Sequence, residues 1–402
     1  MKIGIMGGTF DPIHNGHLYI AENALSEFSL DKVLFIPTGI SYMKEGFSKA
    51  EDRLAMTELA ISGRKHFEVS DIETKRGGNT YTADTIRELK AQYPKDKFYF
   101  IIGTDTLFML EKWKDPEYIF ENVTVIVAAR QDEQSDNQKK KAKEYKDRYG
   151  AKIKFLSAKE MPVSSTRIRA GFKIPDTNYR TAPDCPEKVA KYAEKHALYK
   201  LPMTEEEMLE LLKEDLKPKR IIHSFGVRDT AVKLAEIHGY DVNKARIAGL
   251  LHDCAKYESL EGKKALCARF SYPVTEIELS NPELLHAKAG AALARLKYCI
   301  DDPEIIDAIY YHTTGRPNMD PISLIIFISD YIEPGRNHSP KLDDFRAVAE
   351  IDLKKCAALI LEETLLYLDS RPGNKIKAID PATKQSYESY KIYLESENTN
   401  ED

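Results

Sequence analysis

Residues 2–17 read KIGIMGGTFDPIHNGH, and this stretch decides the fold of the first half of the chain. It starts as a short apolar run, typical of a buried strand, and the run ends at the glycine pair Gly7 and Gly8. Similar runs, separated by helical patterns, occupy residues 32–36, 98–102, 123–128 and 152–156. Because alternating strands and helices build parallel sheets with helices on both faces, we predict an α/β domain.

The second half of the chain has a different pattern. From about residue 204 the apolar residues recur at helical spacing, strand signals are nearly absent, and glycine and proline separate the segments. The expected helices cover residues 205–214, 220–238, 243–256, 286–297, 303–312, 321–332 and 342–368. We therefore predict an α/β domain at 1–200, an all-α domain at 204–390 and an acidic tail at 391–402.

Composition excludes several classes of protein. The 402 residues suffice for two or three domains, and 42% hydrophobic with 31% charged residues is typical of folded rather than disordered chains. A net charge of -5 argues against a nucleic-acid binder, and the longest apolar run, residues 322–328, is too short to span a membrane. Five scattered cysteines without a C-x-x-C pair indicate a reducing cytoplasm. The sequence does not decide the oligomeric state, so a homo-oligomer stays open.

The loop after the first expected strand has the features of a phosphate site. Gly7 and Gly8 let the backbone approach a ligand closely, and the helix that opens near His17 offers free N–H groups and the positive end of its dipole. Two imidazoles, His14 and His17, can donate to phosphate oxygens as charge develops. The loop is neither a G-x-G-x-x-G fingerprint nor a Walker loop.

Two motifs of the first half resemble the signatures of the nucleotidyltransferase superfamily. The stretch 8–17 resembles its T/H-x-G-H signature, and VSSTRIR at 163–169 resembles its I-S-S-T-x-I-R signature. Hydroxyls at a helix N-terminus and a guanidinium fork also suit phosphate. The resemblance implies a Rossmann-like fold that binds ATP, with Mg²⁺ bridging the phosphates. The ATP-binding residues it implies are Gly7, Gly8, Thr9, Phe10, Ser164, Ser165, Thr166 and Arg169.

The residues between the two motifs resemble nicotinate mononucleotide adenylyltransferases. The resembling stretches are FIPTG at 35–39, TYTADT at 80–85, IGTD at 102–105 and LEKW at 110–113. The resemblance implies that Thr85 and Trp113 lie at the nicotinate site and that Asp105 contacts the mononucleotide. Members of the family often carry P-P-H-K after the first stretch, whereas this chain reads SYMK at 41–44, so Lys44 stays a candidate phosphate contact while the histidine is missing.

The chemistry that this resemblance implies is adenylyl transfer. The phosphate of nicotinate mononucleotide attacks the α-phosphorus of ATP in line, and pyrophosphate leaves, giving nicotinate adenine dinucleotide for NAD biosynthesis. Catalysis then rests on positioning and charge stabilisation, for which we assign His14 and His17 to the ATP phosphates. The features at 80–85 and Trp113 argue against phosphopantetheine as acceptor, but nicotinamide mononucleotide stays open as an alternative.

Six candidate metal ligands lie on or beside the helices expected in the second half. They are His223, His252, Asp253, His286, His312 and Asp330. An ionisable group such as Asp330, next to an apolar run, is costly to bury unless it is paired or coordinated. Histidine and carboxylate ligands without thiolate suit Fe, Mn, Co or Zn. Four of the six would hold one metal, and His286 with His312 allows a second, bridged by Asp253.

The order H…HD…H…H…D resembles the HD superfamily of metal-dependent phosphohydrolases. The stretches RIIHSFGV at 220–227, GLLHDCAK at 249–256, YYHTTG at 310–315 and SDYIEPGR at 329–336 resemble the bacterial family that cleaves diadenosine tetraphosphate symmetrically to two ADP. That resemblance implies a di-iron centre, in which Asp253 would be the bridging ligand. We add as candidate phosphate contacts Lys256, Arg316 and Arg336. A different nucleotide phosphohydrolase, or a nucleotide sensor that regulates the transferase, stays open.

Overall fold

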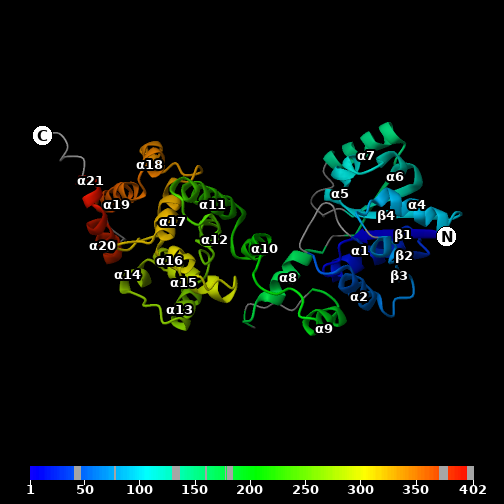
Figure 1. The fold of residues 1–402 in the computed structure, drawn as a ribbon, viewed down its shortest axis with the longest axis horizontal. Coiled ribbons are helices and arrows are strands. Elements are labelled where there is room, and N and C mark those ends of the chain that lie inside the picture. Colours follow the sequence, from blue (N-terminus) through cyan, green and yellow to red (C-terminus); the bar gives the residue numbers. More distant parts are fainter. Residues whose placement is uncertain are drawn as a thin grey trace. The chain divides into compact units, whose positions relative to one another are not determined.

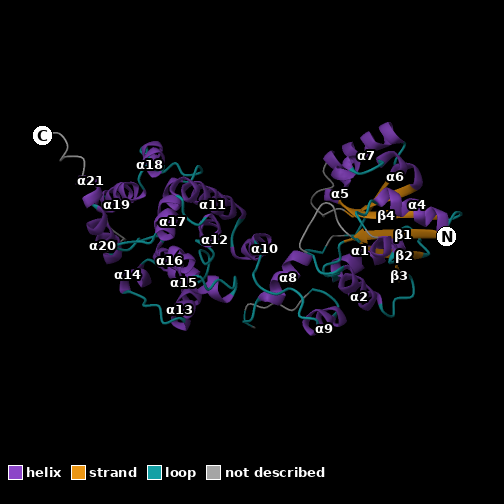
Figure 2. Ribbon diagram, viewed as in Figure 1, coloured by secondary structure: helices purple, strands orange, loops and turns teal. Residues whose placement is uncertain are grey.

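The computed structural model describes residues 1–39, 47–76, 78–128, 136–158, 161–176, 178, 184–370 and 379–395. The chain divides into two compact units. The first contains Met1–Lys173 and Thr181–Lys200, and the second contains Ile174–Arg180 and Leu201–Asp402. Within the described ranges, all strands belong to the first unit, and the second is helical (Figure 2). The predicted succession of an α/β fold and an all-α fold is confirmed.

A parallel sheet with the order β3-β2-β1-β4-β5-β6 forms the centre of the first unit (Figure 1). Its strands are β1 (Lys2–Gly8), β2 (Lys32–Pro37), β3 (Phe67–Val69), β4 (Lys97–Gly103), β5 (Val123–Ala128) and β6 (Lys152–Leu156). The register places Ile5 of β1 beside Leu34 of β2 and Phe100 of β4. The sequence did not predict β3, because three residues are too few to give an alternating pattern.

Helices cover both faces of the sheet (Figure 1). One face packs against α1 (Asn15–Glu27), α2 (Ala50–Ile61), α8 (Ser165–Lys173) and α9 (Glu187–Lys195). The other packs against α4 (Thr82–Gln92), α5 (Thr104–Met109), α6 (Pro116–Asn122) and α7 (Asp136–Tyr149). The short α3 (Ile72–Arg76) and the 3₁₀ helix η1 (Leu110–Lys112) complete the unit. Alternate residues of β4 point to opposite faces of the sheet. Ile101 packs in the core on the side of α1, and Phe100 and Ile102 pack in the core on the side of α4.

The second unit packs its helices around a core of aliphatic side chains. Its helices are α10 (Glu205–Asp215), α11 (Pro218–His238), α12 (Val242–Leu251), α13 (Leu260–Arg269), α14 (Glu276–Ser280), α15 (Pro282–Leu296), α16 (Pro303–Tyr311), α17 (Pro321–Ile332), α18 (Leu342–Ala349), α19 (Leu353–Asp369), α20 (Pro381–Tyr390) and α21 (Ile392–Glu395). Gly249 brings α12 close to α11, because a Cβ there would lie 2.8 Å from the Cα of Arg228. None of the described helices combines the length and the apolar character that crossing a membrane requires.

Two expectations about the second half were wrong in detail. The helix predicted at 243–256 stops at Leu251, which leaves the His252-Asp253 pair in a turn. The helix predicted at 342–368 is two helices, because Asp352 accepts hydrogen bonds from the backbone N–H groups of Lys354 and Lys355 and so starts α19. The acidic tail expected at 391–402 stays a prediction: α21 covers its residues Ile392–Glu395, and residues 396–402 lie outside the described ranges.

Candidate functional sites

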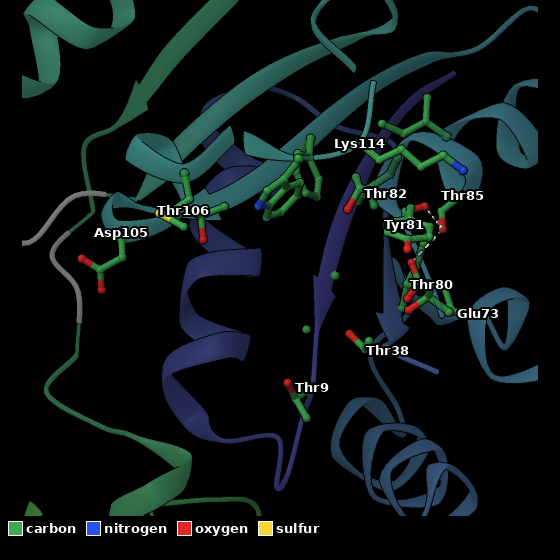
Figure 3. A pocket seen from close by; sticks show the side chains of 18 residues that line it. Thr9, Thr38, Glu73, Thr80, Tyr81, Thr82, Thr85, Asp105, Thr106 and Lys114 are labelled. Carbon is green, nitrogen blue, oxygen red and sulfur yellow. Dashed lines mark hydrogen bonds between the residues drawn. The ribbon is translucent and has the colours of Figure 1, made fainter. Parts of the chain in front are cut away.

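A cavity of about 420 Å³ opens at the carboxyl ends of β1 and β4 (Figure 3). These two strands are where the strand order of the sheet reverses, which is where ligands bind in open α/β sheets. The cavity is lined by six of the predicted site residues: Gly7, Gly8, Thr9, Thr85, Asp105 and Trp113. Residues that lie far apart in the sequence therefore share one cavity.

One wall of this cavity carries a buried carboxyl group that the sequence analysis missed. The hydroxyl of Thr85 donates to Glu73 Oε1 at 2.7 Å (Figure 3), and it accepts from Arg76 Nη2 at 3.0 Å. Burial raises the pKa of Glu73 above its ordinary value. The indole Nε1 of Trp113 is buried without a hydrogen-bond partner in the described part of the chain, so a donor is available to a ligand.

The two motif histidines stack on each other at the start of α1. Their ring centroids lie 3.7 Å apart, and Nδ1 of His17 accepts a hydrogen bond from the backbone N–H of His14 at 3.2 Å. Burial lowers the pKa of His14 to about 4, and burial followed by the charge of His14 lowers the pKa of His17 well below its usual range. Both rings are therefore neutral at pH 7, and the proton of His17 sits on Nε2.

Gly16 makes the stacking of the two histidines possible. A Cβ at this position would lie 3.1 Å from Nδ1 of His14 and 3.2 Å from its Cε1. Contacts that short would push the imidazole of His14 aside. The glycine of the motif thus protects the placement of the first histidine.

The second motif docks on the loop that carries the first. Ser165 Oγ donates to the carbonyl oxygen of Pro12 at 2.9 Å, and Arg169 Nη1 donates to that of Asp11 at 2.8 Å. Within the motif, Thr166 Oγ1 accepts from Arg169 Nη2 at 3.2 Å, and Ser164 Oγ accepts from the backbone N–H of residue 167 at 3.1 Å. The two motifs therefore form one site, although about 150 residues separate them.

Two further predicted residues have special positions. The side chain of Phe10 is buried in the core, where its ring packs edge-on against His17 with centroids 5.1 Å apart. Lys44 lies outside the residues that the structure describes.

The sequence analysis also missed two residues that hold the first motif. The guanidinium of Arg53, buried in α2, donates to the carbonyl oxygens of Thr9 at 2.8 Å, Gly39 at 3.0 Å and Ser48 at 3.0 Å. The hydroxyl of Tyr199 donates to Asp11 Oδ1 at 2.8 Å. An arginine among the buried positions of an amphipathic helix was the signal that could have indicated Arg53.

The six predicted metal ligands of the second unit come together in one cluster. Three overlapping groups of ligand atoms, each within 4.8 Å of one another, combine His223, His252 and Asp253; His252, His312 and Asp330; and Asp253, His286 and His312. The side chains come from α11, α15, α17 and the turns after α12 and α16. Asp253, like His252 and His312, belongs to two of the groups, and its two oxygens face different histidines: Oδ1 lies 2.8 Å from His286 Nε2, and Oδ2 lies 3.4 Å from His252 Nε2.

The hydrogen bonds of the cluster favour a bound cation. His252 and His312 donate Nδ1–H to backbone carbonyls three residues earlier, at 2.8 Å and 2.7 Å, and His286 does the same, so Nε2 of each ring faces the cluster. There, Nε2 of His286 lies 3.0 Å from Nε2 of His312 and 2.8 Å from Asp253 Oδ1, an oxygen that makes no hydrogen bond with the described residues. Two ring nitrogens and a carboxylate oxygen that approach this closely are donor types that a shared transition-metal ion would bind.

Arginines accompany both carboxylates of the cluster. Arg220 donates to Asp253 Oδ2 at 2.8 Å, and Arg336 donates to both the carbonyl and the carboxylate of Asp330. Burial alone would raise the pKa of Asp253, but His252 and His286 hold it well below the usual range. Burial and the neighbouring histidines lower the pKa of His312 to about 3, so this ring is a neutral ligand.

The candidate phosphate contacts of this unit differ in position. Lys256 Nζ lies 3.4 Å from His286 Nε2, beside the cluster. Arg316 pairs instead with Asp320 at 3.1 Å and with Asp307 at 3.4 Å, neither of which is a candidate ligand. A cavity of about 260 Å³ adjoins the cluster and is lined, among others, by His312, Asp330, Arg336, Phe327, Ile360 and Leu361.

Comparison with known proteins assigns the two units to families. The Cytidylyltransferase-like family model matches residues 5–171, and the HD domain model matches residues 220–335. A probable nicotinate-nucleotide adenylyltransferase of Lachnoclostridium phytofermentans is 43% identical over 200 residues, which are 49% of this chain and 98% of that protein. The first unit belongs to the nicotinate-nucleotide adenylyltransferase family.

The HD unit has a relative of its own, and one relative matches both units. The symmetrical bis(5'-nucleosyl)-tetraphosphatase of Bacillus subtilis is 41% identical over 166 residues, 41% of this chain and 88% of that protein, so the HD unit belongs to that family. A probable nicotinate-nucleotide adenylyltransferase/Ap4A hydrolase of Mycoplasma genitalium is 28% identical over 372 residues, 90% of this chain and 97% of that protein. The adenylyltransferase and HD units thus recur together in one relative.

Proposed function

We propose that this chain carries two enzyme activities. The adenylyltransferase unit transfers AMP from ATP to nicotinate mononucleotide and releases pyrophosphate. The HD unit hydrolyses diadenosine tetraphosphate symmetrically to two ADP. The names of the relatives support both activities, and one geometric observation supports each.

For the transferase, that observation is the union of the two motifs beside the 420 Å³ cavity. Gly7, Gly8 and Thr9 line the cavity at one end and lead directly into the loop of His14 and His17. The neutral His17 donates Nε2–H to an ATP phosphate as charge develops there, and ATP brings Mg²⁺ with it. Thr85, Asp105 and Trp113 then hold the mononucleotide so that its phosphate attacks the α-phosphorus in line.

A comparison of two acceptors tests the transferase proposal. Pyrophosphate release is measured with ATP and either nicotinate or nicotinamide mononucleotide. We expect a higher kcat/KM for the acid, because a site built for one group leaves buried donors such as Trp113 Nε1–H badly matched to the other. Equal kcat/KM values would show that the unit also uses nicotinamide mononucleotide. If neither mononucleotide led to pyrophosphate release, the proposal would be refuted.

For the hydrolase, the carrying observation is the set of facing ligand atoms. His223, His252, His286, His312, Asp253 and Asp330 would hold two metal ions, which we propose to be iron, with Asp253 between them. Metals held in this way supply an activated water and neutralise phosphate charge. The 260 Å³ cavity is somewhat smaller than sites for drug-sized ligands, of about 300–1,000 Å³, so we assign to it one nucleoside end of the substrate, with Arg336 and Lys256 near its phosphates.

Product analysis tests the hydrolase proposal. The protein is loaded with Fe²⁺ without oxygen and incubated with diadenosine tetraphosphate, and the products are separated by chromatography. We expect ADP alone. ATP with AMP would show that the water attacks a different phosphorus, and no turnover by a metal-loaded protein would favour the sensor alternative.

Three further points belong to the proposal. We place the boundary between the activities at residues 201–203, and we expect 1–200 and 204–402 each to fold when produced separately. The five free cysteines support a cytoplasmic location. Light scattering of the purified protein decides whether it is a homo-oligomer.

A further inference from the structure

One histidine of the HD cluster is oriented differently from the others. His252, His286 and His312 are fixed by backbone carbonyls of their own segments. His223, in the first turns of α11, directs Nδ1 instead to the side chain of Glu333, with 3.0 Å between Nδ1 and Oε1. Its Nε2 then faces the cluster, 3.0 Å from Asp330 Oδ1 and 3.3 Å from His252 Nε2.

Glu333 sits in a tightly shaped niche. It follows the last residue of α17, its side chain is 5% exposed, and its second oxygen accepts the backbone N–H of Gly335 at 2.5 Å. A Cβ at Gly226, one turn along α11 from His223, would lie 2.5 Å from Glu333 Oε2, and a Cβ at Gly335 would lie 2.9 Å from it. The two glycines therefore leave the room that this carboxyl group occupies.

The turn that carries Glu333 is itself fixed to the cluster. The carbonyl oxygen of Glu333 accepts from the backbone N–H of Arg336 at 2.9 Å and from Arg346 Nη2 at 3.2 Å. Arg336 in turn donates Nε–H to the carbonyl oxygen of Asp330 at 2.8 Å. A single short turn therefore positions one ligand through its carboxyl group and holds the backbone of another.

We propose that Glu333 is a positioning residue of the metal site, which fixes the tautomer and direction of His223 and makes its Nε2 a stronger ligand. A carboxylate that accepts Nδ1–H keeps the proton off Nε2 and adds electron density to the ring, and such partners commonly change metal affinity by about 10–100-fold. The inference rests on the metal-binding part of the proposed function. Glu333 touches neither substrate nor metal, and it acts only through His223.

Two variants of the full-length protein disturb this contact by different routes. Glu333→Gln keeps the size of the side chain but replaces one of two accepting oxygens by a donor. Gly226→Ala keeps the carboxylate itself but pushes it aside with a methyl group. Glu278→Gln is the matched control, because Glu278 is a buried glutamate of the same unit that accepts backbone N–H of Thr275 at the start of α14, as a helix cap. Each metal-free protein is titrated with Co²⁺, and affinity and absorption spectrum are recorded together with the thermal melting of the metal-free form.

We expect Glu333→Gln and Gly226→Ala to bind Co²⁺ about 10–100-fold more weakly and with an altered spectrum, whereas Glu278→Gln binds as the parent does even if it melts earlier. A merely structural role of Glu333 would lower the melting temperature of the metal-free form and leave affinity and spectrum unchanged, and that result would overturn the inference. Unchanged affinity in a well-folded Gly226→Ala variant would also count against it. A parent protein that binds no metal would instead refute the proposed metal site.

Discussion

Replacing His17 separates two roles that its ring performs at once. Nδ1 accepts the backbone N–H of His14 and so completes the start of α1, while Nε2–H is the donor that we assign to phosphate. His17→Ala removes both roles. His17→Glu retains an acceptor at the third position of the helix, where glutamate commonly serves in this way, but it offers phosphate a negative charge in place of a donor.

The expected sizes of the two effects differ. Loss of one preorganised donor costs about 10²–10³-fold in rate, or about 2.7–4 kcal/mol. Loss of the helix-capping contact costs about 1 kcal/mol, which lowers Tm by about 2–4 °C in a unit of this size. His17→Ala should therefore show both losses. His17→Glu should melt close to the parent and yet transfer AMP no faster than His17→Ala.

The assay is pyrophosphate release with saturating ATP and nicotinate mononucleotide, beside thermal melting of each variant without nucleotide. Hydrolysis of diadenosine tetraphosphate by the same preparation is the internal control, since His17 lies in the other unit. A His17→Ala variant that works within tenfold of the parent rate would refute the assignment of Nε2–H to the phosphates. A His17→Glu variant that regains the rate would show that only the helix start matters.

Three other outcomes follow from the geometry. Arg53→Lys should lower the free energy of unfolding in urea by at least about 2 kcal/mol, because lysine cannot donate to all three carbonyl oxygens that the guanidinium contacts. The control, Arg64→Lys, changes an exposed arginine and should have little effect. Equal losses of stability in the two variants would contradict the role of the three Arg53 hydrogen bonds. Asp253→Ala should lose both metals by elemental analysis, whereas His286→Ala should lose mainly one, and two retained metals in Asp253→Ala would exclude the bridge. Burial lowers the pKa of His14 to about 4 from 6.5, so between these pH values the unfolded chain binds more protons and stability falls as the pH drops. His14→Asn should therefore make the melting temperature depend less on pH in this range. An unchanged dependence would argue against a buried neutral ring.

The sequence could predict the features that depend on local pattern. The strands β1, β2, β4, β5 and β6 are apolar runs of ordinary length, and their residues are close to those expected. The candidate ligands of the HD cluster were also predictable, because six groups of the right type recur beside apolar helices. Their arrangement in three overlapping groups, each within 4.8 Å, needed the structure, since α11 and α17 are far apart in the sequence.

The residues that were missed act through contacts with no local pattern. Glu73 and Glu333 look like ordinary acidic residues in the sequence, and only tertiary packing brings them to Thr85 and His223. Arg53 donates to backbone carbonyl oxygens, and every residue has one, so the sequence does not show which residues it contacts. The break at Leu251 was hidden because the turn at 252–257 continues the apolar spacing of α12.

The bonds that aim His252 and His312 also finish helices. Gly249 and Ile309 belong to the last turns of α12 and α16, where carbonyl groups have no N–H of their own helix to accept. Each imidazole satisfies one of these orphan carbonyls with the same hydrogen that turns its other nitrogen inward. Assembly of the two ligands is therefore a by-product of ordinary helix termination. Removing the metals with a chelator should silence the hydrolase while its circular-dichroism spectrum stays helical, unlike a zinc finger, whose fold disappears with its ion.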